Sequence, residues 1–327
     1  MSLYTRKAQR SGVAAAAGGV GRSDESLHRA GWLWFGFAVA SLLLLDAVDL
    51  AVWGVVVPVA AVAIRTLVPF ARVPAEAAPE VDRGDLIAVG LFWVVVVVSF
   101  WTAFEVFTTD RVAGLFLGFA AGLVAGVIGP LWWVVWHRRE PLSALGLTVE
   151  RWRSTVGIGV VLAGVQFAMT LWGYELPEPV DWVPLLVMSL VVGFFEAVFF
   201  RGFIQGRLEA SFGPGLAVLG AAVLYSLYHV GYGMPADELV FLFGLGVVYA
   251  IAFRLVSNIL VLWPLLTPLG AFYNNVEAGD IELPWASIAG FADVAIVMAV
   301  AVWFTARHRR QTLERQEADV GNSLAVQ

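Results

Sequence analysis

The chain has 327 residues, of which 60% are hydrophobic and 14% charged, and its mean hydropathy is +0.80. A water-soluble core does not accommodate so much apolar surface, so the composition excludes an ordinary soluble domain and predicts a polytopic membrane protein. The chain contains no cysteine and has a net charge of −6. Disulfides, thiolate metal ligands, cysteine nucleophiles and lipidated cysteines are therefore excluded.

Residues 1–30 combine basic residues with Gly, Ser, Asp and Glu. Their apolar run, Val13–Ala17, is too short for the hydrophobic region of a signal peptide. We predict that this segment is a disordered cytoplasmic tail.

Ten apolar runs of membrane-spanning length follow the tail. They lie at about residues 31–47, 50–70, 85–107, 112–136, 155–175, 182–206, 214–233, 238–256, 258–277 and 285–306. The first two are separated only by Asp46 and Asp49, but a single helix of that length would exceed the bilayer thickness nearly twofold. The predicted fold is therefore an all-α bundle of about ten transmembrane helices.

The placement of basic residues predicts the orientation of the bundle. With the N-terminus inside, every Lys and Arg except Arg111 falls on an inner segment or inner helix end. We expect a multi-pass protein of the cell membrane with both termini in the cytoplasm. Residues 31–136 would form four leading helices, 137–153 an interfacial cytoplasmic segment, 154–306 a six-helix core and 307–327 a second cytoplasmic tail.

Glycine recurs every fourth residue in the fourth run, at Gly114, Gly118, Gly122 and Gly126. Such a ridge lets another helix approach closely. It predicts tight packing within the chain or, alternatively, contact with a partner helix.

Glu196 lies within the apolar run from Val183 to Ile204. An ionisable side chain at this depth is costly and marks a functional site. Arg201 follows five residues later, about 140° away around an α-helix, so we do not expect the two side chains to be neighbours. Arg201 is expected near the inner end of its helix, where its long side chain could reach interfacial water.

Two later runs carry further polar residues. His229 is the one histidine inside a predicted span, with Tyr225 on the same helical face four residues earlier. Asn274 follows a segment bent by Pro264 and Pro268, where its amide could stabilise an oxyanion or simply cap the outer end of the helix. We predict that Glu196, His229 and Asn274 line one cavity, with the carboxylate within about 5 Å of the imidazole.

These motifs resemble the CPBP family, which comprises CAAX proteases and bacteriocin-processing (Abi) enzymes. Its pattern is Glu-Glu-x-x-x-Arg, then Phe-x-x-x-His, then His-x-x-x-Asn, on successive helices. The resemblance covers about residues 140–305 and assigns the conserved positions to Glu196, Arg201, His229 and Asn274, with Tyr225 in place of phenylalanine.

Two positions depart from the pattern: Ala197 replaces the second glutamate, and Gly270 replaces the histidine of the third motif. The resemblance implies that Glu196 and His229 activate a water, and that Asn274 retains half of an oxyanion site. Loss of one oxyanion donor commonly lowers the rate by about 10²–10³. Without an acid at position 197, Arg201 would have to bond to carbonyls, Glu209 or interfacial water.

The sequence thus predicts an intramembrane endopeptidase that acts on a membrane-associated peptide or protein. Glu196, His229 and Asn274 would be catalytic, and Arg201 and Tyr225 would support the site. One histidine and one glutamate make a poor zinc site, so neither a metal nor another cofactor is expected, and no nucleic-acid partner is expected. The alternatives are an inactive family member that binds membrane segments or lipidated tails and, second, a transporter, which the lack of internal repeats disfavours.

Overall fold

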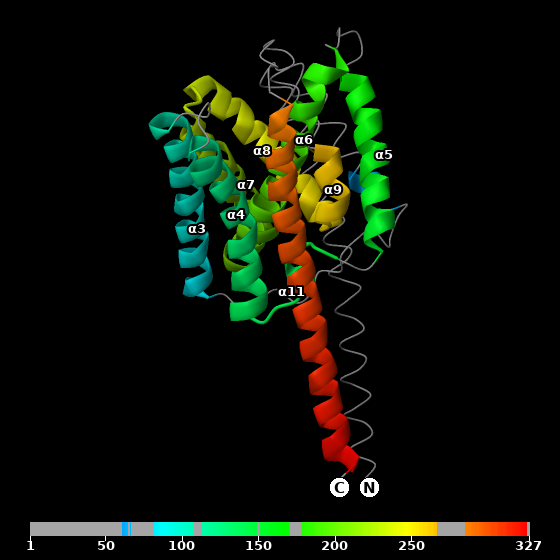
Figure 1. Ribbon diagram of the computed structural model, residues 1–327. Helices are drawn as coiled ribbons and strands as arrows, with labels where there is room; N and C mark the ends of the chain where they lie inside the picture. Colours follow the sequence, from blue (N-terminus) through cyan, green and yellow to red (C-terminus); the bar gives the residue numbers. More distant parts are fainter. Residues whose placement is uncertain are drawn as a thin grey trace. The chain divides into compact units, whose positions relative to one another are not determined.

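The computed structural model describes residues 61–64, 66, 82–107, 113–148, 151–170, 178–266 and 285–325. The described residues are helical or lie in turns, and none of them forms a strand (Figure 1). The helices are α3 (Arg83–Trp101), η2 (Thr102–Val106), η3 (Gly114–Ala120), α4 (Ala121–Leu131), η4 (Trp132–His137), η5 (Leu142–Leu145), α5 (Trp152–Thr170), α6 (Pro179–Glu196), η6 (Ala197–Gln205), α7 (Gly206–Tyr228), η7 (His229–Tyr232), α8 (Ala236–Val256), α9 (Ile259–Leu266) and α11 (Ala286–Ala325). The predicted all-α class is confirmed.

Five of the described helical stretches are long and apolar enough to cross a membrane. They are Arg83–Val106, Gly114–His137, Trp182–Gly231, Ala236–Val256 and Ala286–Arg315. Exposed apolar side chains cover them, including Ile87 and Leu91 on α3 and Val300 and Phe304 on α11. An apolar outer surface of this kind suits a lipid environment, and the chain is a multi-pass membrane protein.

The 50-residue stretch Trp182–Gly231 contains two helices rather than one. Gly213 has φ +78° and interrupts the helical geometry, and Pro214 begins the next helix. Glycine adopts this left-handed conformation without a steric penalty, and proline suits the first turn of a helix. The break therefore falls between the predicted runs 182–206 and 214–233.

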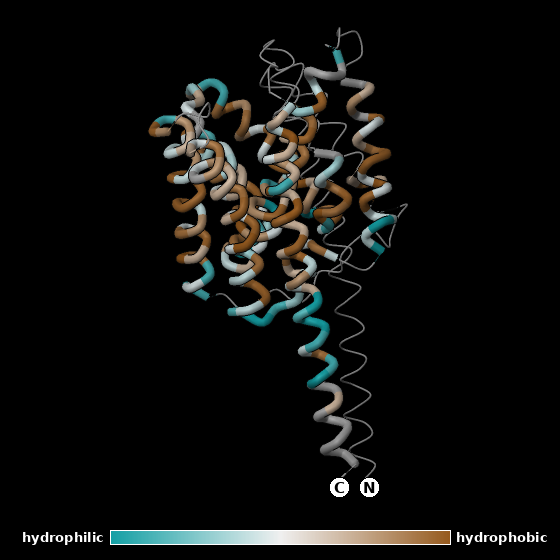
Figure 2. The backbone as a smooth tube through the Cα atoms, in the orientation of Figure 1, coloured by the Kyte–Doolittle hydropathy of each residue, from teal (hydrophilic) through white to brown (hydrophobic). Residues whose placement is uncertain are grey.

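Several predicted segments lie outside the described residues. These are the tail at 1–30, the run at 31–47, most of the run at 50–70 and the part of the ninth run beyond Leu266. The number of ten helices thus stays a prediction. The C-terminal segment predicted as a tail continues α11 as a helix to Ala325, and Figure 2 shows its hydrophilic residues beyond the apolar part of the bundle.

The glycine ridge packs within the chain. A Cβ atom on Gly118 would lie 2.6 Å from the Cα of Ala103, and one on Gly126 would lie 2.1 Å from the ring of Phe195. Gly122 faces Phe100 in the same way. The ridge thus lets α3, η2 and α6 approach α4 and η3, while its use by a partner helix stays a prediction.

The helices of the predicted core pack on one another and on the leading helices. α7 packs against α8 and η6, α5 against α9, and α11 against both α6 and α4. α3 and α4 in turn contact α7 and η6 respectively. The junction between α6 and η6 is therefore enclosed by helices from both halves of the described chain.

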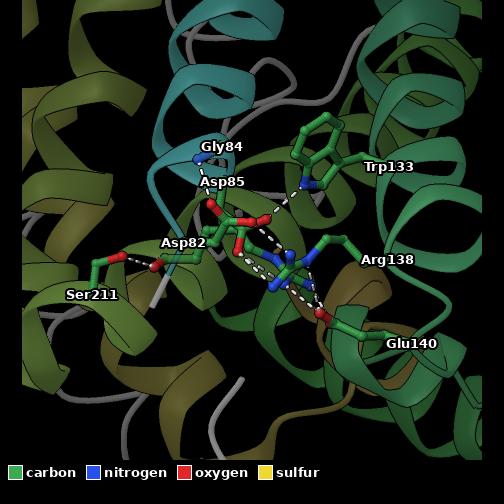
Figure 3. A network of polar contacts seen from close by, with 8 residues as sticks. Asp82, Gly84, Asp85, Trp133, Arg138, Glu140 and Ser211 are labelled. Carbon is green, nitrogen blue, oxygen red and sulfur yellow. Dashed lines mark hydrogen bonds and ion pairs between the residues drawn. The ribbon is translucent and has the colours of Figure 1, made fainter. Parts of the chain in front are cut away.

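A polar network joins α3, η4 and α7 (Figure 3). Arg138 binds Asp82 at 2.7 Å, and the indole of Trp133 donates to Asp85 at 2.7 Å. Arg207 makes a two-pronged ion pair with Glu140, with one contact at 2.8 Å. Asp85 and Arg207 are each 2% exposed, so water does not solvate their charges. The opposite charges around them stabilise them instead.

Candidate active site

Glu196 lies where α6 passes into η6, and two tyrosines hold its carboxylate. The hydroxyl of Tyr228 donates to Oε1, and the hydroxyl of Tyr225 lies 3.4 Å from Oε2. Glu196 itself is only partly buried. Each carboxylate oxygen can accept more than one hydrogen bond, so the side chain can still receive a water.

The tyrosines belong to the last turn of α7. Their contacts with the carboxylate place that turn at the same level as Glu196. His229 directly follows Tyr228, so the hydrogen bond from Tyr228 brings His229 close to the level of Glu196 as well.

His229 directly follows α7 as the first residue of η7 and is 6% exposed. Its Nδ1 lies 2.9 Å from the carbonyl oxygen of Tyr225. A carbonyl only accepts, so Nδ1 carries the hydrogen and Nε2 is the acceptor nitrogen of the neutral ring. The centroid of the imidazole lies 4.0 Å from that of Tyr228 and 5.2 Å from that of Tyr225.

The two tyrosines therefore connect Glu196 with His229. Each contacts the imidazole through its ring and the carboxylate through its hydroxyl. Phe195 and Phe200 pack around the same group, with the ring of Phe200 4.7 Å from that of Tyr228. This aromatic surrounding lowers the local polarity and strengthens electrostatic interactions inside the site.

The helix around Arg201 differs from the α-helix assumed from the sequence. Residues Ala197–Gln205 form a π-helix, whose hydrogen bonds join residues five apart. Even so, neither Nη atom of Arg201 has a hydrogen-bond partner within the described part of the chain, so the guanidinium is not bonded to the Glu196 carboxylate through these atoms, which agrees with the expectation that the two side chains are not neighbours.

Arg201 does not reach interfacial water, because it is 2% exposed and lies well before the end of its helix at Gly213. Its guanidinium carbon lies 4.9 Å from the ring centre of Tyr225 and 5.9 Å from that of Tyr249. Glu209, an expected partner, pairs instead with Arg254 at 2.9 Å. The structure thus places Arg201 inside the cluster rather than at a membrane surface.

Four of the predicted residues, Glu196, Arg201, Tyr225 and His229, are gathered in one cluster. Asn274 and Gly270 lie outside the described residues, so the third motif and its contribution to the site stay predictions. Sequence reasoning missed Tyr228. Its position three residues after Tyr225, on the same helical face, is the signal that could have identified it.

Among the described residues, no group of three or more His, Asp or Glu side chains is arranged to hold a metal ion. Glu196 and His229 would together supply two ligands, fewer than the three protein ligands of a catalytic zinc site. The expectation that the site uses no metal therefore stays a prediction.

The fold and the site define an all-helical, multi-pass membrane protein with a glutamate, two tyrosines and a histidine clustered within its bundle. Residues 178–265 match the family model described as type II CAAX prenyl endopeptidase Rce1-like. This match confirms the resemblance predicted from the motifs, and it includes Glu196, Arg201 and His229 but ends before Gly270. No curated protein and no solved structure matches the chain.

Proposed function

We propose that the protein is an intramembrane endopeptidase in which Glu196 activates a water to cleave a membrane-associated peptide or protein. The observation that carries this proposal is the position of the carboxylate. Two phenol hydroxyls fix it beside an imidazole, within a segment that matches a family of membrane proteases. A base held in position beside an imidazole is what the activation of a water for hydrolysis requires.

In the proposed reaction Glu196 takes a proton from a water whose oxygen attacks the peptide carbonyl carbon. The carbonyl π electrons move to its oxygen, which becomes an oxyanion. As the oxyanion collapses, the C–N bond breaks and the amine leaves with the proton that Glu196 accepted. His229, through Nε2, orients the water or shares that proton.

Asn274 is proposed as the oxyanion donor, and Arg201 and Tyr225 as supporting residues. The protein is proposed to lie in the cell membrane with both of its termini in the cytoplasm. These assignments follow the motif resemblance and the positive-inside rule.

A second candidate is an inactive family member that binds membrane segments or lipidated tails. The observation that favours it is the environment of Arg201, which lies beside Ala197 and has no acidic partner in direct contact within the described chain. An enzyme of this family would have a glutamate at that position.

Purified full-length protein tested on a panel of membrane-tethered peptides decides between the two candidates. Cleavage should be lost in Glu196→Gln and in His229→Ala, while both variants insert and fold. Glu238→Gln is the matched control, because Glu238 is exposed at the start of α8. Cleavage that persists unchanged in both site variants would refute the proposed role of these residues, and a wild-type protein that binds peptides without cleaving any would favour the binding protein.

A further inference from the structure

One face of α11 is left uncovered by the other described helices. Ile296, Val300 and Trp303 follow one another on this face at helical spacing and are 59%, 54% and 56% exposed. Arg307 and Arg310 continue the face at spacings of four and three residues, and both are exposed. Along a single side of the helix, the face therefore changes from apolar to aromatic to basic.

The length of this face matches one leaflet of a bilayer. Arg310 lies fourteen residues after Ile296, which corresponds to about 21 Å at about 1.5 Å per residue. A leaflet with its headgroups is about 20–22 Å thick, half of the whole bilayer. Ile296 and Val300 would therefore lie beside acyl chains, Trp303 at the boundary of the hydrocarbon, and the two arginines beside headgroups.

A second helical segment supports this position of the membrane surface. Phe291 of α11 packs on Phe119 of η3, and His308 of α11 stacks on Trp136 of η4 with ring centroids 3.9 Å apart. The second contact lies seventeen residues after the first on both segments, so α11 runs parallel to the segment formed by η3, α4 and η4 (Figure 1). Trp136 is partly exposed beside α11, as is typical of an indole at a membrane interface. Both segments therefore reach the same membrane surface at this level.

The arginines of this face have no acidic partner. The guanidinium carbon of Arg307 lies 5.4 Å from the ring centre of Trp303, and neither Arg307 nor Arg310 forms an ion pair within the described chain. Glu314, the next acid along this face, is exposed and likewise makes no ion pair with a described residue. Arg138, at the end of η4, is by contrast bonded to an acid. The positive charge of α11 is therefore open to an external anion.

We propose that this face of α11 binds an anionic phospholipid. The phosphate would accept hydrogen bonds from Arg307 and Arg310, and the acyl chains would pack along Ile296 and Val300. A guanidinium can donate two parallel hydrogen bonds to a phosphate. Phosphatidylcholine presents the same phosphate but adds a positively charged choline, which the two arginines repel. The site therefore prefers phosphatidylglycerol, whose headgroup carries a net negative charge.

Native mass spectrometry of the full-length protein in detergent micelles tests this site. The probes are dioleoyl phosphatidylglycerol and dioleoyl phosphatidylcholine, which share their acyl chains, and the Kd of the first bound molecule of each is measured. An arginine at a membrane surface contributes about a fivefold preference for anionic lipid, so two arginines should give a preference of about 10-fold or more.

Two double variants separate the site from the net charge of the protein. Arg307→Gln combined with Arg310→Gln should bring the ratio of the two Kd values to about 1. The control combines Arg83→Gln with Arg315→Gln and removes the same charge. Arg83 is exposed at the start of α3, and Arg315, five residues after Arg310, points to another side of α11. The control should keep the preference for phosphatidylglycerol.

Equal Kd values for the two lipids in the wild-type protein would overturn the proposed site. An equal loss of preference in both double variants would also overturn it, because net charge would then decide binding. Displacement of the lipid by its deacylated headgroup, glycerophosphoglycerol, at similar concentration would assign the arginines to a soluble anion. A dimer that forms in the wild-type protein and dissociates in the variant of Arg307 and Arg310 would assign the face to a second copy of the chain. These outcomes do not depend on proteolysis.

Discussion

Replacing Gly126 by alanine tests how tightly the glycine ridge fixes the helix that carries Glu196. The new Cβ would lie 2.1 and 2.5 Å from two ring carbons of Phe195, which is fully buried and directly precedes Glu196. The ring cannot retreat into solvent, so the backbone or several neighbours must move. Overpacking of this kind typically costs about 1–3 kcal/mol.

Gly90→Ala is the control for this substitution. Gly90 is exposed in the middle of α3, and a Cβ there would meet nothing within 4 Å. Alanine raises helix propensity at both positions by about 0.5–1 kcal/mol, so this gain cancels when the two variants are compared. The difference between them measures the packing cost at Gly126.

The free energy of unfolding of both variants is measured by denaturant titration of the full-length protein in detergent micelles. We expect Gly126→Ala to be less stable than Gly90→Ala by about 1–3 kcal/mol. Equal stability of the two variants would show that α4 and α6 do not approach as closely as the structure indicates. Reduced proteolysis in Gly126→Ala would in addition connect this packing to the position of the carboxylate.

Three further outcomes are expected. Tyr228→Phe removes a hydrogen bond to a charged group, so kcat should fall about 10-fold or more, whereas wild-type kcat would show that the hydroxyl does not position the carboxylate. Arg207→Met removes an almost fully buried charge from its ion pairs with Glu140 and Asp85 and should lower the free energy of unfolding by about 3–5 kcal/mol. Arg254→Met, in a pair with side chains 25% and 27% exposed, should cost less than about 1 kcal/mol, and equal costs would contradict the assigned burial. Reporter fusions after Asp181 and after Gly279 should both be external, and a cytoplasmic signal from either would overturn the predicted topology.

The helices could be predicted from the sequence because the bilayer imposes a minimum length on each apolar run. The runs at 85–107, 112–136 and 238–256 agree with helices in the structure to within a few residues. The break between the sixth and seventh runs was also recognisable, since glycine followed by proline is a local signal. These features depend on hydrophobicity and on backbone chemistry, which a single sequence displays directly.

The details of the candidate site were harder to predict from the sequence. A π-helix has no hydrophobic signature that separates it from an α-helix, so the sequence could not show that Ala197–Gln205 departs from α-helical geometry. The burial of Arg201 depends on Tyr225 and on Tyr249 of α8, which lies far along the chain. Tyr228 was overlooked because an aromatic residue in an apolar helix is usually a packing residue, and its hydroxyl gains a role only when another helix brings Glu196 to it.

The π-helix also changes how the spacing between Glu196 and Arg201 sets the directions in which their side chains point. Each residue of an α-helix turns the chain by about 100°, whereas the wider π-helix turns it less, so five residues return to nearly the same side. Deleting one residue within Ala197–Phe200 would allow this segment to become α-helical with the carboxylate and the guanidinium still on a common face. The residues beyond it, including Gln205, would keep their side of the helix for the same reason, and with it their register against α8. The segment can thus gain or lose one residue without changing which side chains of η6 face α8.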